Sequence, residues 1–141
     1  MAKKYFETDD NIQEQVKTMF ASLGLAEVGI KLQIISTTKQ KDVVKVAKTS
    51  EPTEFLTETD NAIQVFIYEN VFFELDSVTQ DFLLEFAFNP VWFDSDKNKV
   101  MIEKNPYQPL FNLRKKYGER ADEMLEASYL AIKQFEERIN E

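Results

Sequence analysis

Carboxylates have the greatest capacity for chemistry in this sequence, because its 141 residues include no histidine and no cysteine. These two absences exclude Cys–His and Ser–His catalysis, thiolate-bound metals and the H-E-x-x-H zinc motif. The side chains left for catalysis are carboxylates, lysines, arginines, tyrosines and hydroxyls. We therefore expect a protein that is not an enzyme and that uses no cofactor.

One acidic run has the spacing of a cation-binding loop. Asp94, Asp96 and Asn98 follow the D-x-D-x-N opening of an EF-hand. The sixth position, where an EF-hand needs glycine, is Lys99, and the twelfth is Asn105 instead of glutamate. Asp, Ser and Asn are also the usual residues of ordinary turns, so the pattern favours a turn over a calcium site.

A second pair of carboxylates has helical spacing. Asp81 and Glu85 are one turn apart and would lie on the same face of a helix. Paired carboxylates can bind Mg²⁺ or divide acid and base roles between them, so a hydrolase that uses Mg²⁺ or Ca²⁺ is one alternative. The solvated face of an amphipathic helix has the same spacing, and we favour this interpretation.

The net charge of −8 is unevenly distributed along the chain. No lysine or arginine occurs between Thr49 and Asp96, whereas the segment from Lys31 to Lys48 has five lysines and one acid. Direct binding of nucleic acid needs a basic surface, so the overall acidity disfavours it. Two interpretations stay open: a solvated face that maintains solubility, or a surface for a basic partner. The eleven acids of the cation-free stretch are Glu51, Glu54, Glu58, Asp60, Glu69, Glu74, Asp76, Asp81, Glu85, Asp94 and Asp96.

Seven side chains are our candidates for contact with a protein partner. Five are acids of the cation-free stretch, and two are large aromatic residues of the kind that dominates binding hot spots. The alternative for the aromatic residues is a place in the core. The seven are Glu69, Glu74, Asp76, Asp81, Glu85, Trp92 and Tyr107.

The elements that position these residues follow from apolar periodicity, which predicts one α+β domain over residues 1–141. We expect a small mixed sheet packed against helices. Strands are predicted at 30–36, 43–49 and 63–68, and a β-hairpin at 91–94 and 99–103, with Val91 and Phe93 facing one way and Trp92 the other. A loop is predicted at 50–61. Helices are predicted at 8–23, 78–88 and 119–140, with a short turn at 69–75 and a further helix that begins near Pro106 and Pro109 and ends at Gly118.

The helix predicted at 78–88 is apolar around most of its circumference, which indicates a buried central helix. Asp76 or Ser77 can cap it, and Ser77 with Gln80 matches a capping box. Pro90 should end it and move Asn89 out of the helical region. The last helix, at 119–140, should be the longest, with Leu125, Ile132, Phe135 and Ile139 in its apolar stripe.

Two segments, LLEFAFNPVWFD and NPYQPLFNLRKKYG, stand in an order of elements that resembles the zincin-like metallopeptidases encoded by bacteriophages. Those proteins carry a pattern like L-L-x-H-E-L-x-H-V, an aspartate soon after it, and a third histidine ahead of a helix that ends in R-Y-G. The match covers about Ile63 to Gly118. The resemblance implies a phage origin and a zincin-like core.

The resemblance also implies that the zinc site has been lost. The family's first histidine, glutamate and second histidine fall on Phe86, Ala87 and Pro90, and its third histidine falls near Asn105. None of these residues can replace the lost ligands or the general base. The chain would then be a pseudoenzyme, a degenerate member of the family that kept the fold.

Together these observations favour a non-catalytic interaction protein in the host cytosol. It would bind a basic host protein, for example one that itself binds nucleic acid, through its acidic face, in a role such as host takeover. A structural or assembly component of a virion is the alternative, besides the hydrolase above. The N-terminal segment has no apolar stretch of a secretory signal, and no run of about 18 apolar residues predicts a membrane span. The sequence does not predict an oligomeric state.

Overall fold

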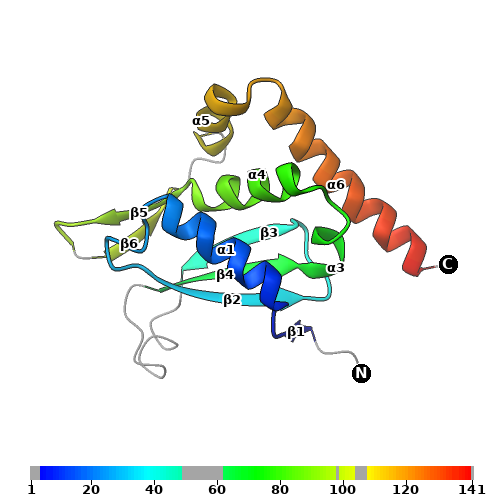
Figure 1. Ribbon diagram of the computed structural model, residues 1–141, viewed down its shortest axis with the longest axis horizontal. Helices are drawn as coiled ribbons and strands as arrows, with labels where there is room; N and C mark the ends of the chain where they lie inside the picture. The colour runs from blue at the N-terminus through cyan, green and yellow to red at the C-terminus, as the bar shows by residue number, and fades with distance from the viewer. Residues whose placement is uncertain (1–3, 49–61, 98, 104–107, 141) are drawn as a thin grey trace.

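The computed structural model describes residues 4–48, 62–97, 99–103 and 108–140, and its class is α+β, as predicted (Figure 1). The described helices are α1 (Asp10–Ser22), α3 (Glu69–Phe72), α4 (Ser77–Phe88), α5 (Gln108–Tyr117) and α6 (Arg120–Ile139). The described strands are β1 (Tyr5–Phe6), β2 (Lys31–Thr37), β3 (Val44–Lys48), β4 (Ala62–Tyr68), β5 (Val91–Asp94) and β6 (Lys99–Ile102). The predicted loop at 50–61 lies outside the described residues.

The larger sheet is mixed and has β4 at its centre. Its strand order is β1-β2-β4-β3, with β2 and β4 parallel and the other two pairs antiparallel. Ile63, Val65 and Ile67 of β4 are fully buried. Gln64 and Phe66, which point to the opposite face, are only half-buried, so the apolar run of β4 has one fully covered face and one partly covered face. The prediction of a strand at 63–68 is confirmed.

Helix α4 is the buried helix that the sequence predicts. Phe82 and Leu84 are 0% exposed and Phe88 is 1% exposed. In Figure 1, α1 crosses in front of the larger sheet and contacts α4, which lies above the sheet, and α5 and α6 pack against α4 from the side away from the sheet. The buried apolar residues of these helices and of the sheet form one cluster, so α4 has protein on most of its circumference. This arrangement accounts for its lack of a polar face.

The ends of α4 differ from two predictions. Asp76 is the N-cap, and its carboxylate accepts a hydrogen bond from the Thr79 N–H (3.0 Å), whereas the Gln80 side chain donates to the Phe72 carbonyl (2.7 Å) in place of a capping box. Asn89 stays helical (φ −54°, ψ −40°), so the prediction that Pro90 moves it out of the helical region is wrong. The Asn89 N–H donates to the Glu85 carbonyl (2.9 Å), and this bond opposes the modest steric bias that proline imposes.

The predicted hairpin is β5–β6, and its side chains alternate as expected. Val91 is buried and pairs with Ile102, whereas Trp92 is 46% exposed.

The last helix, α6, is the longest at 20 residues, but Ile139 at its end is 60% exposed and does not join the apolar stripe. Among the helices that the structure describes, none is long and apolar enough to cross a lipid bilayer.

Two adjacent phenylalanines test this account of the core. Phe72 is 0% exposed, whereas Phe73 is 55% exposed. We expect Phe72→Ala to lower the free energy of unfolding by about 3–5 kcal/mol, because it leaves a cavity. Phe73→Ala should lower it by less than about 0.5 kcal/mol, because it removes only surface contacts. Urea denaturation of the two variants measures both values, and equal losses would contradict the assignment of Phe72 to the core.

Candidate functional site

The three described positions onto which the resemblance maps zinc-motif residues lie together. Phe86, Ala87 and Pro90, at the end of α4, line one cavity of about 330 Å³. Asn105 lies outside the described residues. Phenylalanine, alanine and proline side chains have no atom that coordinates Zn²⁺, so these positions do not fit the metal. Apolar residues of β3, α4 and α6 supply much of the remaining wall: Val44, Val46, Leu83 and Leu125.

The hydroxyl groups of this cavity already have partners. The Tyr129 hydroxyl donates to the Asp42 carboxylate (2.9 Å), and the Ser128 hydroxyl donates to the Leu125 carbonyl (2.6 Å). Burial, followed by the hydrogen bond and the charge of Asp42, raises the pKa of Tyr129 to about 12. A phenol with so high a pKa stays protonated at neutral pH and acts as a donor to Asp42, which suits a structural link between α6 and the segment before β3.

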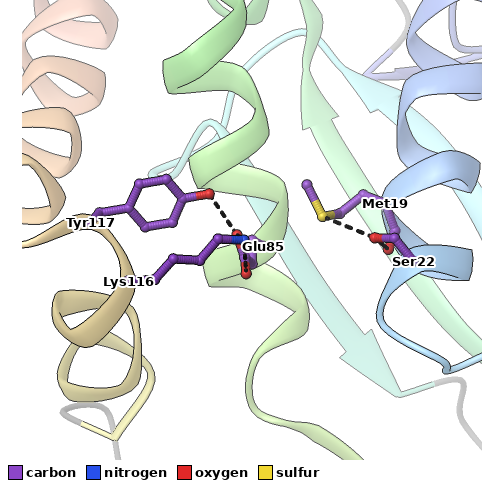
Figure 2. A network of polar contacts seen from close by, with 5 residues as sticks. All are labelled: Met19, Ser22, Glu85, Lys116 and Tyr117. Atoms are coloured by element: carbon purple, nitrogen blue, oxygen red, sulfur yellow. Dashed lines mark hydrogen bonds and ion pairs between the residues drawn. The ribbon is translucent and has the colours of Figure 1, made fainter.

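Glu85 is buried at the centre of a polar network between α4 and α5 (Figure 2). The residue is 6% exposed, and its carboxylate accepts hydrogen bonds from the Lys116 ammonium (3.0 and 3.1 Å) and from the Tyr117 hydroxyl (2.6 Å). The hydrogen bond with Glu85 raises the pKa of Lys116, and burial together with Glu85 raises the pKa of Tyr117. Both partners therefore remain protonated, and the network attaches α5 to α4.

Two of the acids predicted to bind a partner are inside the protein. Glu85 is one, and Glu69 is 8% exposed, with an Oε2 atom that has no hydrogen-bond partner among the described residues. Both were assigned to an exposed acidic face, and this assignment is wrong for them because α3 and α4 turn these positions toward the interior. Asp81 remains exposed one turn away from Glu85, so the two carboxylates do not form an accessible pair.

The other three acids of this set lie near the start of α4. Glu74 forms an ion pair with Arg138, Asp76 caps α4, and Asp81 accepts a hydrogen bond from the Gln15 side chain (3.0 Å). Hydrogen bonding to Thr79 lowers the pKa of Asp76, so this carboxylate is charged at neutral pH. The start of α4 therefore carries the exposed negative charge that the sequence predicts.

The aromatic candidates do not join these acids. Trp92 lies in β5, beyond the far end of α4, and 12 helical residues separate the two ends by roughly 18 Å. Tyr107 lies outside the described residues. The predicted partner-binding residues thus divide between the interior and two distant parts of the surface.

Two exposed apolar residues that the sequence analysis missed stand beside the acids. Phe73 is 55% exposed and Val78 is 42% exposed. The Gln80–Phe72 hydrogen bond connects α3 to the first turn of α4, and Phe73 and Val78 belong to the backbone at this junction. We define the α3–α4 corner as Phe73, Glu74, Asp76, Val78 and Asp81. The run Val71-Phe72-Phe73 could have indicated an exposed apolar residue here, because a single helical turn cannot bury three consecutive side chains.

The acidic turn between β5 and β6 bonds to its own backbone. The Asp94 carboxylate accepts hydrogen bonds from the N–H groups of Asp96 (3.1 Å) and Lys97 (3.3 Å). This is the local bonding that makes aspartate common in turns. Asn98 lies outside the described residues. Within the ranges that the structure describes, no group of three or more acidic side chains is arranged to hold a metal ion.

The Glu85 network makes a specific prediction for stability. Tyr117→Phe removes a hydroxyl donor from a buried carboxylate, so we expect the free energy of unfolding to fall by about 1–3 kcal/mol. Tyr5→Phe is the matched control, because Tyr5 is 50% exposed and its loss of a hydroxyl should cost less than about 0.5 kcal/mol. Urea denaturation compares the two, and a Tyr117→Phe variant as stable as the control would contradict the network.

The tyrosines also predict how stability changes at alkaline pH. The pKa of Tyr129 is raised to about 12, and burial with the nearby Glu136 raises that of Tyr68 to about 12, from an ordinary value of 10.0. The folded state therefore holds these two phenolic protons more tightly than the unfolded state does. The resulting contribution to the free energy of unfolding is complete below pH 10 and is lost as the pH rises toward about 12. Chemical denaturation across this range should show the decline, and the double variant Tyr68→Phe, Tyr129→Phe should decline less steeply.

Comparison with known proteins adds no family assignment. No family model, no curated protein and no solved structure matches this chain. The resemblance to phage metallopeptidases stays a prediction from the sequence.

Proposed function

We propose that this protein is a non-catalytic interaction protein that acts in the cytosol and binds a basic protein partner through the α3–α4 corner. The single observation that supports the proposal is the exposure of Phe73 and Val78 in the same short segment, residues 73–81, as three exposed carboxylates. An apolar centre with a charged rim is the usual composition of a protein-binding surface. The apolar residues would supply most of the affinity, and the charges would select a basic partner.

Local charge balance supports a basic partner. Of the three carboxylates at the corner, Glu74 pairs with Arg138, but the hydrogen bonds to Asp76 and Asp81 come from uncharged groups. Cations of α6 approach two of these acids, because Arg138 pairs with Glu74, and hydrogen bonding to Thr79 together with the charge of Arg120 lowers the pKa of Asp76. Asp81, whose carboxylate accepts a hydrogen bond from the uncharged Gln15 side chain, would therefore be the main attraction for lysine or arginine side chains of a partner.

The proposal that the protein is non-catalytic rests on the residue types that the chain lacks and on the structural role of its buried carboxylate. The chain has no histidine or cysteine, and Glu85, a buried carboxylate, is occupied by Lys116 and Tyr117. The proposal keeps the expectation that the chain is a degenerate, phage-encoded relative of zincin-like metallopeptidases. This expectation rests on the resemblance in the sequence, because Phe86, Ala87 and Pro90 lie within about one turn of one another and would share a cavity in any such helix.

Variants of the corner test the proposal. The immobilised full chain is incubated with bacterial lysate at low salt, and the retained partner is identified and its dissociation constant measured. Phe73→Ala and Asp81→Lys should each weaken binding about tenfold or more. High salt should also weaken binding, since screening reduces the attraction between exposed charges.

Matched variants elsewhere on the surface provide the controls. Phe111 on α5 is also 55% exposed, and Glu123 on α6 is an exposed acid. Phe111→Ala and Glu123→Lys should leave the dissociation constant unchanged. Binding that responds equally to all four substitutions, or that is independent of salt, would contradict a role for the corner.

A further inference from the structure

A second pocket, of about 420 Å³, has the opposite electrostatic character from the rest of the protein. Four lysines line it, although the chain as a whole has a net charge of −8. They come from the segment before β1, from the connection between β2 and β3, and from β3 itself. The four are Lys4, Lys39, Lys41 and Lys45.

The carboxylates near this pocket do not neutralise the lysines. The ion pairs that the described residues form involve Arg114, Lys116 and Arg138, and none involves a lysine of the pocket. Asp42 is the one described acid in the pocket wall, and its carboxylate accepts the hydrogen bond of Tyr129. Four lysines against one carboxylate leave the described pocket wall with an excess of positive charge, which a bound anion would offset.

A buried hydroxyl in the pocket wall lacks a partner. Thr37, the last residue of β2, is 2% exposed, and its Oγ1 atom has no hydrogen bond among the described residues. A buried polar group without a partner is unfavourable, and such groups often mark a site for a ligand or water. Thr37 and the four lysines line the same pocket, and rotation of the enclosed hydroxyl toward it would offer a donor to a bound oxyanion.

The rest of the wall is aromatic and well anchored. The rings of Tyr5 and Phe66 lie 6.0 Å apart between centroids, and Tyr5 is 50% exposed. The Gln40 side chain donates to the carbonyls of Val43 (3.2 Å) and Phe66 (3.0 Å), which fixes the segment carrying Lys39 and Lys41 against β4. Lys39 and Lys41 therefore project from a held segment, and the Lys4 ammonium lies over the Tyr5 ring, 5.3 Å from its centroid.

We infer that this pocket binds a phosphorylated small molecule with a flat ring, that is, a nucleoside phosphate. The phosphate would lie among the four lysines and accept a hydrogen bond from the Thr37 hydroxyl. The base would pack on the Tyr5 ring, since aromatic side chains stack on bases of any type. The pocket volume lies within the range of about 300–1,000 Å³ for small-molecule sites. This inference is independent of the α3–α4 corner.

Titration calorimetry of the full chain with ADP tests the inference. We expect saturable one-to-one binding that weakens as salt rises. The double substitution Lys41→Gln, Lys45→Gln should weaken ADP binding at least tenfold and reduce its dependence on salt. Lys17→Gln is the control, because Lys17 is an exposed lysine on α1 outside the pocket, and it should leave binding unchanged.

Thr37→Val separates a binding role from a structural one. The substitution preserves shape and removes the hydroxyl, so the unliganded variant should be at least as stable as the original protein. ADP binding should nevertheless weaken about tenfold. A stable Thr37→Val variant with unchanged ADP affinity would overturn the role of Thr37.

Two further ligands test the ring and the phosphate separately. Adenosine should bind much more weakly than ADP, and inorganic phosphate should bind more weakly than ADP but compete with it. No heat of binding with ADP at low salt would overturn the inference. Binding of a short oligonucleotide without binding of ADP would also overturn it, because the pocket would then be part of a larger nucleic-acid surface.

Discussion

The rest of the structure depends on the burial of α4. Phe82, Leu84 and Phe88 are almost completely removed from water, and a single buried aromatic side chain can contribute several kcal/mol to stability. The features discussed above take their positions from this helix. The α3–α4 corner surrounds its start, the Glu85 network attaches α5 to its middle, and the cavity lined by Phe86 lies at its end. A change in the packing of α4 would therefore displace all three together.

Polar groups near α4 show that acids from one acidic stretch of the sequence have different roles once the chain is folded. The cation-free stretch suggests one acidic surface, but the structure uses its acids in several ways. Glu85 joins two helices, Asp76 caps a helix, Asp94 closes a turn, and only part of the charge remains free for a partner. The positive residues are similarly divided, since Lys116 stabilises the interior whereas Lys41 and Lys45 line a pocket. Net charge alone therefore says little about where a protein presents its charge.

Periodicity predicted most of the elements, because it records which face of a strand or helix avoids water. The central position of β4, the burial of α4 and the alternation of Val91 and Trp92 all follow from local patterns. The burial of Glu85 could not be predicted, since its partners Lys116 and Tyr117 lie more than 30 residues away in the chain. The basic pocket was hidden only in part, because Lys39, Lys41 and Lys45 belong to the lysine-rich segment 31–48. The pairing of β1 with β2 and of β3 with β4 adds Lys4, Tyr5 and Phe66 from distant segments.

The position of β3 in the sheet has a consequence for self-association. Among the described strands, β1 and β3 form the edges of the larger sheet, and β1 has only two residues. An open edge offers unpaired backbone groups to a strand of another molecule, and lysines on an edge strand discourage such pairing. Lys45 and Lys48 on β3 are exposed. Edge-to-edge growth into aggregates would bring these lysines of neighbouring copies close together, so the sheet is protected from extending beyond a single chain.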